Sequence, residues 1–365
     1  MLAYLLAITA LVVIAGRLGD IMGRRRLLLV GLSLFTMASV LCGLANTLGQ
    51  LIAARAVQGV GAAIMMALTH AFVSDAVPTA NTGSAMGLLA TVSAVGTAVG
   101  PSLGGLLIAW FGWRAIFYAN VPLGLAALVL AYRYLPAALS VEQHDPAARD
   151  PGLAVVAAMF RDRALRSSLA MNVLVSTVMM STLVVGPFYL SRSLALNPTS
   201  VGFAMSVGPV VTALIGIPSG RIADRLGAPR MTLFGLIGIA SGACLLSILP
   251  ASCGLLGYLG PIAIVTAGYG LFQTANNTVV MAGAHAAQRG VTSGLLNLSR
   301  NLGLITGASV MGAVFALASG SDDITRAHAL AVRAGMRGTY ALAALVIVAA
   351  LTVGARNDRF APRYA

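Results

Sequence analysis

The chain has 365 residues, of which 58% are hydrophobic and only 9% are charged, and its mean hydropathy is +0.91. Soluble globular domains usually contain about 25% charged residues, so this composition excludes that class and predicts a polytopic membrane protein. The net charge of +13 is compatible with nucleic-acid binding, but the placement of the arginines gives another explanation.

Apolar segments follow one another along the chain, and nearly all reach the roughly 20 residues that a helix needs to cross a bilayer. We predict an all-α fold with eleven such segments, at residues 1–15, 27–46, 50–74, 82–110, 115–135, 167–190, 200–219, 231–250, 254–284, 290–318 and 338–356.

A charged turn between the first two segments occurs a second time. Residues 16–31 and 220–235 share seven of sixteen positions. A glycine-rich stretch that begins at Gly87 also recurs 207 residues later. An internal repeat of this kind is typical of secondary transporters and predicts two pseudo-symmetric helical bundles. The shared residues of the turn include Gly16/Gly220, Asp20/Asp224 and Gly23/Gly227.

The repeat also predicts the domain limits. The segment at 167–190 precedes the second copy, and its counterpart would begin before residue 1. We therefore expect that a first helix is missing, that eleven of twelve spans are present, and that the first span is shortened. The expected parts are an N-terminal bundle (1–135), a linker (136–166), a C-terminal bundle (167–357) and a tail (358–365).

Arginines set the expected orientation. Sixteen of the 23 lie in one set of loops and ends and five lie in the other. Because positively charged loops stay in the cytoplasm, the turn at Gly16, the linker and the C-terminus are predicted to be cytoplasmic. This asymmetry explains the basic charge, and we expect no nucleic-acid partner.

Several motifs together resemble the major facilitator superfamily, and more closely its drug/proton antiporter branch. The turn at residues 16–26 resembles the signature that follows the second helix, residues 55–61 resemble that of the fourth, and residues 96–105 resemble the antiporter signature of the fifth. The resemblance implies a multi-pass exporter of small amphipathic molecules in a bacterial inner membrane. It also implies multidrug efflux by alternating access and proton antiport.

The turn residues are candidates for a conformational latch. Asp20 lies where it can face the N-terminus of the segment at 290–318, whose free N–H groups favour an anion, and Asp224 can do the same at 82–110. The alternative is that the arginines only set topology. The predicted latch residues are Gly16, Asp20, Gly23, Arg24, Arg25, Arg26, Asp75 and Asp224.

Polar residues inside the apolar segments are candidates for coupling, because a charge in the hydrocarbon core needs a partner or a cavity. Arg55 can instead extend to the outer surface, Arg300 can bond neighbouring carbonyls, and His70 can be a structural histidine. The coupling candidates are Arg55, Gln58, His70, Arg300 and Asn301. The cavity candidates, for which hydrogen bonding between helices is the alternative, are Asn172, Ser176, Gln273, Asn276 and Asn277.

Glycines at the antiporter signature predict close helix packing, with a proline that frees a carbonyl and can kink the helix. These residues are Gly96, Gly100, Pro101, Gly104 and Gly105. None of the ten acids lies in the middle of a segment, so a proton carrier, if protons are used, is expected either on the missing helix or in an unconventional group.

Two other functions remain open within this fold: export of one specific metabolite, and an inactive truncated product. An enzyme is not expected, because no His-x-x-x-His and no paired intramembrane carboxylates occur. We expect no metal or cofactor. The expected partners are a small-molecule substrate, protons and the lipid bilayer, with the chain as a monomer.

Overall fold

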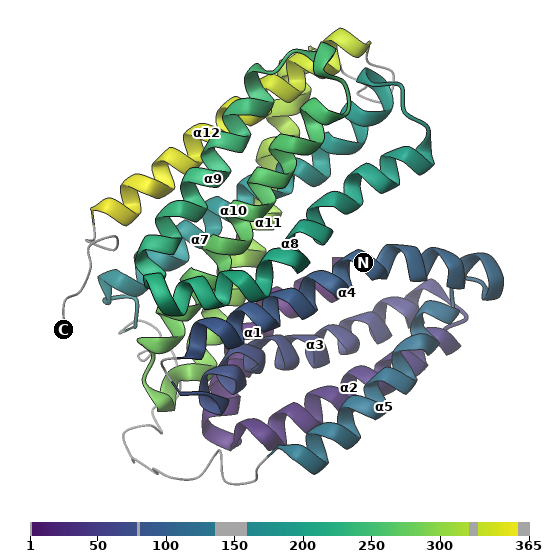
Figure 1. Ribbon diagram of the computed structural model, residues 1–365. Coiled ribbons are helices and arrows are strands. Elements are labelled where there is room, and N and C mark those ends of the chain that lie inside the picture. Colours follow the sequence, from purple (N-terminus) through teal and green to yellow (C-terminus); the bar gives the residue numbers. More distant parts are fainter. Residues whose placement is uncertain (1, 79–80, 136–158, 321–327, 357–365) are drawn as a thin grey trace. The chain divides into compact units, whose positions relative to one another are not determined.

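The computed structural model describes residues 2–78, 81–135, 159–320 and 328–356, and within them all regular structure is helical, without strands (Figure 1). Eight helical segments of this part are long and apolar enough to cross a membrane. The long helices are α1 (Leu2–Met22), α2 (Arg24–Leu44), α3 (Leu48–Ala76), α4 (Thr82–Phe111), α5 (Ala115–Tyr134), α7 (Arg163–Phe188), α8 (Pro198–Leu226), α9 (Ala228–Ile248), α10 (Leu256–Ala282), α11 (Arg289–Ser319) and α12 (Ala329–Ala355). Short helices are η3 (Tyr189–Ser193), η4 (Ala251–Cys253) and η5 (Ala286–Gln288).

Each predicted apolar segment overlaps one of these helices, but the charged turn is shorter than expected. α1 continues through residues 16–22, and Gly23 alone separates it from α2. Gly23 has φ 94° and Gly227, between α8 and α9, has φ 85°. Glycine adopts this left-handed region without steric cost, so one residue is enough to redirect the chain. The expectation of a first span limited to residues 1–15 is therefore wrong for the helix itself.

The start of α12 also differs from the prediction. The apolar segment was expected from residue 338, whereas the helix begins at Ala329 and includes Arg333 and Arg337. Arg333 donates through Nε to Ser193 Oγ at 2.8 Å and through Nη2 to the Ser193 carbonyl at 3.3 Å. A hydropathy count treats these arginines as loop residues, but a satisfied guanidinium is compatible with the first turns of a helix.

Local sequence signals fix other helix ends. Thr47 Oγ1 accepts from the Gln50 backbone N–H at 3.2 Å, and Gln50 Oε1 accepts from the Thr47 N–H at 3.3 Å. This reciprocal capping box satisfies two of the donors that a helix start leaves free, and it begins α3.

The described residues form two compact units. Unit 1 contains residues up to 79, 99–162 and 280–298; unit 2 contains 80–98, 163–279 and 299 onward. α4 and α11 therefore contribute to both. The predicted division at the linker stays a prediction, since residues 136–158 and 357–365, which include most of the linker and the predicted tail, lie outside the described part.

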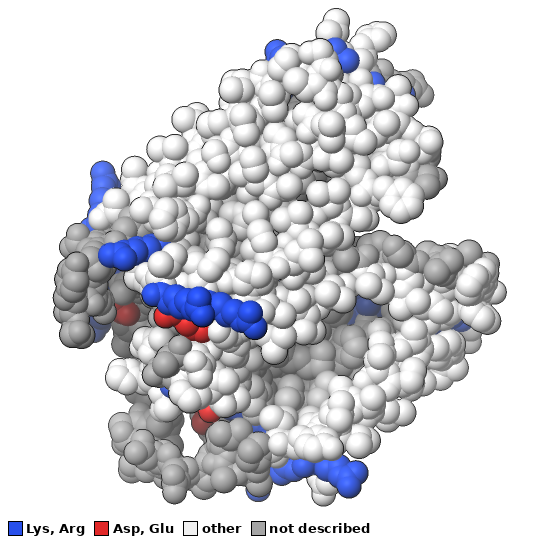
Figure 2. Space-filling view, in the orientation of Figure 1, with Lys and Arg blue, Asp and Glu red and all other residues white. Residues whose placement is uncertain are grey.

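Each unit has its own apolar core. In unit 1 buried side chains from α1, α2 and α3 pack together, among them Val12, Leu27 and Leu68. In unit 2 the core is larger and includes Tyr258 and Phe315. On the face drawn in Figure 2 most of the described surface carries no charge.

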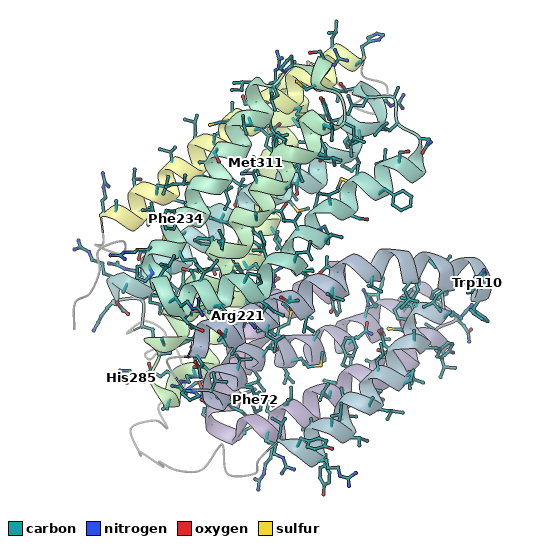
Figure 3. All side chains as sticks on the ribbon, in the orientation of Figure 1. Phe72, Trp110, Arg221, Phe234, His285 and Met311 are labelled. Carbon is teal, nitrogen blue, oxygen red and sulfur yellow. The ribbon has the colours of Figure 1, made fainter. Side chains whose placement is uncertain are left out.

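Large apolar side chains remain exposed outside these cores. Trp110 at the end of α4 is 71% exposed (Figure 3), and Leu214 on α8 is 70% exposed. Exposed apolar helix faces are expected of a protein whose surroundings are lipid, and aromatic residues at helix ends are typical of the membrane interface.

Candidate functional site

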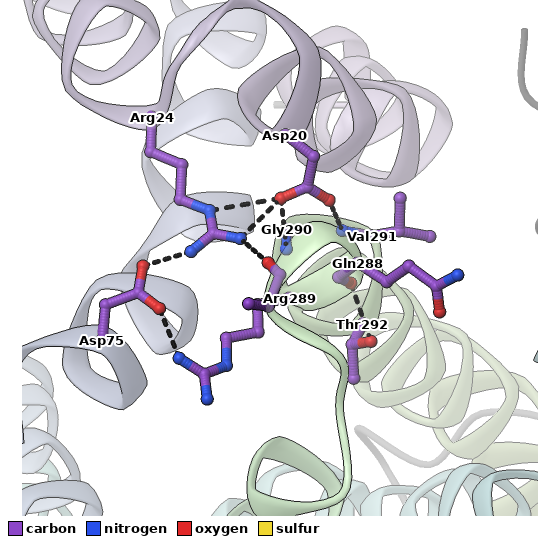
Figure 4. A network of polar contacts seen from close by, with 9 residues as sticks. Asp20, Arg24, Asp75, Gln288, Arg289, Gly290, Val291 and Thr292 are labelled. Atoms are coloured by element: carbon purple, nitrogen blue, oxygen red, sulfur yellow. Dashed lines mark hydrogen bonds and ion pairs between the residues drawn. The ribbon is translucent and has the colours of Figure 1, made fainter. Parts of the chain in front are cut away.

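The turn at Gly23 positions the carboxylate of Asp20 at the start of α11. Asp20 Oδ1 accepts from the Gly290 N–H at 2.9 Å and Oδ2 accepts from the Val291 N–H at 3.0 Å (Figure 4). These are donors that the first turn of a helix cannot satisfy internally, and the partial positive charge of the helix terminus adds to the attraction. The Asp20 side chain is only 1% exposed.

Two arginines and a second aspartate complete the arrangement. Arg24 donates to Asp20 Oδ1 from Nε at 3.2 Å and from Nη2 at 2.8 Å. Its Nη1 pairs with Asp75, and its Nη2 also donates to the Ala286 carbonyl at 2.6 Å. Arg289 Nη1 donates to the other oxygen of Asp75 at 2.6 Å. We refer to Asp20, Arg24, Asp75, Arg289 and the Gly290 and Val291 N–H groups as the Asp20 network.

The Asp20 network is largely shielded from water. The side chains of Arg24 and Asp75 are 8% and 10% exposed, and that of Arg289 is 20% exposed. Two carboxylates balance two guanidinium groups, so its formal charge is zero. Because desolvated charges are costly alone, loss of one partner from such a buried set typically costs about 3 to 5 kcal/mol.

Opposing effects act on the protonation of Asp20, which lies beyond the apolar segment 1–15. Burial raises the pKa of the Asp20 carboxyl, while the Arg24 charge and the N–H groups of Gly290 and Val291 act to lower it. The ionised form of Asp20 therefore depends on Arg24 remaining beside it.

Glycines allow the backbones to meet at this point. A Cβ added at Gly16 would overlap the Gly290 carbonyl oxygen, and one at Gly290 would lie 2.6 Å from Asp20 Oδ1. One turn further along α11, a Cβ at Gly294 would lie 2.7 Å from the Val12 carbonyl oxygen. A side chain at these positions would push α1 and α11 apart, so the glycines are a condition for the Asp20 contact.

Unit 2 contains a related contact between Asp224 and the start of α4. The Asp224 oxygens accept from the Gly83 and Ser84 N–H groups, each at 2.9 Å, and from Ser84 Oγ. Gly220 is the close-approach residue here, since its added Cβ would lie 2.7 Å from the Ser84 Cα. We refer to these residues as the Asp224 site. It differs from the Asp20 network because Asp224 is exposed and no ion pair to it occurs in the described residues.

Two of the predicted latch arginines lie elsewhere. Arg25 donates through Nη2 to the Tyr132 carbonyl at 2.6 Å, and its guanidinium lies 5.5 Å from the centre of the Tyr132 ring. Arg26 is exposed. Consecutive residues of a helix point about 100° apart, so only Arg24 of the three arginines can face both aspartates.

The close packing predicted at the antiporter signature stays a prediction. A Cβ added at Gly96, Gly100 or Gly104 would meet no atom of the described residues within 4 Å. Close approach of α4 occurs nearer its start instead, at Gly83 and Gly87. The surroundings of Pro101 and Gly105 are outside what the structure describes.

Arg55 is held by partners from several helices. Its Nη1 donates to Gln58 Oε1 at 2.5 Å, and Gln58 Nε2 donates to Ser39 Oγ of α2 at 2.7 Å. The guanidinium also lies 4.5 Å from the centre of the Tyr4 ring and 5.5 Å from that of Phe117. Extension to the outer surface is thus not what the structure shows.

The cavity candidates of unit 2 fall into two groups. Asn172 Nδ2 donates to Ser299 Oγ at 2.7 Å, which is hydrogen bonding between helices. In contrast, buried atoms of Ser176 (Oγ), Gln273 (Oε1) and Asn276 (Nδ2) have no partner in the described residues. Asn277 is buried, and His70 and Asn301 are partly buried.

Sequence reasoning missed the partners on the other side of each contact. Arg289 was counted only as a topology marker, although it immediately precedes the segment whose N-terminus was expected to receive Asp20. Gly83 and Ser84 were not singled out at all. The available signal was a glycine in the first turn of each apolar helix, since Gly83 and Gly290 are separated by the 207-residue offset of the repeat.

Known proteins resemble this chain over most of its length. The riboflavin transporter RibZ of Clostridioides difficile (strain 630) is 27% identical over 94% of this chain and 85% of its own. The multidrug resistance protein Stp of Mycobacterium tuberculosis (strain CDC 1551 / Oshkosh) is 27% identical over 86% of this chain and 68% of its own.

The fold has a counterpart among solved structures. That of the human organic anion transporter MFSD10 (TETRAN) superposes with a TM-score of 0.76 at 16% identity, covering 96% of this chain and 82% of that one. The family model described as Major Facilitator Superfamily matches residues 1–308. With the all-helical fold described above, this match shows that the chain belongs to the major facilitator superfamily of membrane transporters.

Proposed function

We propose that the chain is a secondary active exporter of small amphipathic molecules that works by alternating access and exchanges its cargo for protons. The proposal places it as a multi-pass monomer in a bacterial inner membrane, with the C-terminus in the cytoplasm. The observation that carries it is the Asp20 network, supported by membership of the superfamily.

The Asp20 network suits a reversible closure. Its contacts join the ends of α1, α2 and α3 to the first turn of α11, and they are polar contacts on glycine-lined helix ends. Such contacts separate without disrupting an apolar core. In the proposed cycle the Asp20 network and the Asp224 site close the cytoplasmic side while the outer side is open, and both break when the protein opens to the cytoplasm.

A relative supports a second candidate function. RibZ is named for riboflavin, a single metabolite, whereas Stp is named for multidrug resistance. An exporter of one specific metabolite has the same fold and the same closure, so the two candidates differ only in the range of cargo.

The experiment compares dye efflux from cells that express the full chain, using ethidium, fluorescein and riboflavin, with and without a protonophore. Export of several unrelated dyes that the protonophore stops is the expected result. Export of riboflavin alone would favour the specific exporter, and no export of any dye, from cells in which the protein is present in the membrane, would refute multidrug export.

Matched variants link the transport to the closure. Asp20→Asn is expected to lower the rate of export, because the closed cytoplasmic side is less stable. Arg26→Gln removes a charge from the same turn at an exposed position outside the network and is expected to leave the rate unchanged. Equal rates for Asp20→Asn and the unmodified chain would contradict the gating role.

A further inference from the structure

Arg300 on α11 is a charged residue deep within a membrane-spanning helix. It follows Gly290, whose N–H belongs to the Asp20 network, by ten residues, which is about 15 Å along a helix axis. α11 runs from Arg289 to Ser319, so Arg300 lies well inside the helix and not at one of its ends. A charged side chain within the hydrocarbon core is costly, so such an arginine usually faces a partner or a polar cavity.

The two intramembrane arginines, Arg55 and Arg300, differ in whether the guanidinium has a partner. The Arg55 guanidinium has a hydrogen-bond acceptor in Gln58 and lies over two aromatic rings. Aromatic faces and amide oxygens both stabilise a guanidinium, so the fold itself accounts for Arg55. The Arg55 guanidinium is therefore stabilised by side chains of the protein.

Arg300 has no such partner within the described residues. It is partly buried, its Nε is inaccessible to water, and that atom has no hydrogen-bond partner. The aspartates of the helix ends are already engaged: Asp20 and Asp75 in the Asp20 network, and Asp224 with the start of α4. The remaining acids are not in the middle of any apolar segment. Among the described residues no acid pairs with Arg300, so an anion from another molecule can take that place.

A second unsatisfied donor lies one helical turn away. Gly303, three residues after Arg300, packs against α7, and its added Cβ would lie 2.6 Å from the Ser176 Cβ. Ser176 is fully buried, and its Oγ has no partner in the described residues. The contact of α7 with α11 thus brings Arg300 Nε and Ser176 Oγ, two buried atoms without a partner in the described residues, to the same stretch of α11.

We propose that Arg300 binds an anionic group of the transported molecule, so that the cargo is an amphipathic organic anion with a carboxylate or a similar oxyanion. The guanidinium offers a planar fork of N–H donors that matches a carboxylate, and charge-assisted hydrogen bonds are strongest where water is excluded. Ser176 Oγ supplies a further donor. This inference rests on the proposed transport function and names the chemical class of its cargo.

The test uses two probes that differ in one group. Dansylglycine carries a free carboxylate, and dansylglycinamide is the same fluorophore with an uncharged amide. Binding of each to the purified full chain in lipid nanodiscs is measured by dansyl fluorescence, and uptake of each is measured in proteoliposomes with a pH gradient. The unmodified chain is expected to bind dansylglycine about tenfold more tightly than dansylglycinamide, because one charge-assisted contact distinguishes them.

The variants assign that preference to Arg300. Arg300→Gln is expected to abolish the preference without weakening the binding of dansylglycinamide, whereas Arg300→Lys keeps the charge and retains part of the preference. Arg192→Gln removes an exposed arginine of η3 and is expected to leave both affinities unchanged. If Arg300→Gln does not fold, Arg300→Lys alone decides, since an intermediate preference for the carboxylate is still expected of it.

The outcomes separate this inference from the proposed function. Equal affinities of the unmodified chain for the two probes, or an equal loss of both in the Arg300 variants, would overturn the role of Arg300. Carboxylate-selective binding without uptake of either probe would leave that role intact and contradict transport. Uptake of both probes at equal rates and with equal affinities would support transport and contradict the role of Arg300.

Discussion

The substitution Asp20→Asn tests the Asp20 network directly, because it keeps the size of the side chain and removes its charge. The aspartate accepts from two backbone N–H groups of α11 and from Arg24. An asparagine has only one acceptor oxygen. Its amide group would therefore direct N–H bonds at another donor, either in the first turn of α11 or on Arg24.

The expected cost follows from the contacts that are lost. At least one charge-assisted hydrogen bond in a site with 1% exposure disappears, which costs about 1.5 to 3 kcal/mol. The attraction between the carboxylate and the helix terminus adds about 0.3 to 1 kcal/mol. Asp75 still contacts Arg24, and the uncompensated charge is shared with Arg289, whose side chain is 20% exposed, so the full penalty of an isolated buried charge does not apply. We expect about 2 kcal/mol, or roughly a thirtyfold shift towards the separated state.

Hydrogen exchange measured by mass spectrometry in nanodiscs reports this separation without a transport assay. The peptide that covers residues 286–295 contains the Gly290 and Val291 amides, which Asp20 protects. Asp20→Asn is expected to exchange roughly thirtyfold faster in that peptide, since exchange follows the population of the open state.

The repeat supplies a reciprocal control. Asp224→Asn is expected to accelerate exchange in the peptide that covers residues 81–88 and not in 286–295, and by a smaller factor, because Asp224 is exposed. Unchanged exchange at Gly290 and Val291 in a correctly folded Asp20→Asn protein would refute the assignment of these amides to Asp20. Equal acceleration in both peptides would indicate general destabilisation instead.

Further substitutions test the charge balance, the glycine contacts and the buried arginine. Arg24→Gln removes a charge that lowers the pKa of Asp20, so ionised Asp20 becomes costly near neutral pH. The melting temperature of this variant is expected to lie below that of the unmodified chain, and the difference is expected to shrink as the pH falls from about 8 to about 5, because Asp20 becomes protonated. A difference that does not change with pH would contradict this. Gly220→Ala is expected to lower stability by about 1 to 3 kcal/mol through overlap with α4, whereas Gly96→Ala, where the space is open, serves as its control in thermal denaturation. Gln58→Leu should lower the melting temperature of the unmodified chain by more than it lowers that of the Arg55→Leu variant, because the two side chains act as one pair. Additive effects of the two substitutions would exclude that coupling.

The helices and the two aspartates could be inferred from the sequence because their signals are local or repeated. Long apolar segments mark the helices, and the recurrence of Gly16, Asp20 and Gly23 at a fixed offset marks the turns. The same regularity gave the expected direction of Asp20 towards the start of the segment at 290–318. The role of these residues as a latch stays a prediction.

Other features depend on geometry that spacing does not contain. The sequence does not distinguish Arg24 from Arg25, since both follow the same glycine, and only the orientation of α2 separates the network from the contact with Tyr132. The glycines of the antiporter signature predict a smooth surface but not what covers it. Likewise, Arg55 and Arg300 both lie within apolar segments, and only the arrangement of Gln58, Tyr4 and Phe117 shows that the Arg55 guanidinium is satisfied.

The two copies of the turn also differ in strength, and this difference bears on the proposed cycle. The repeat retains glycine and aspartate, whereas Ala228 stands at the position of Arg24. Asp20 is consequently buried among charges, while Asp224 is exposed and held by neutral donors. Exposed contacts contribute little free energy because water competes for them. The stability of the proposed closed state should therefore depend mainly on the contact of α1 with α11, and the contact of α8 with α4 should mainly fix the geometry of approach.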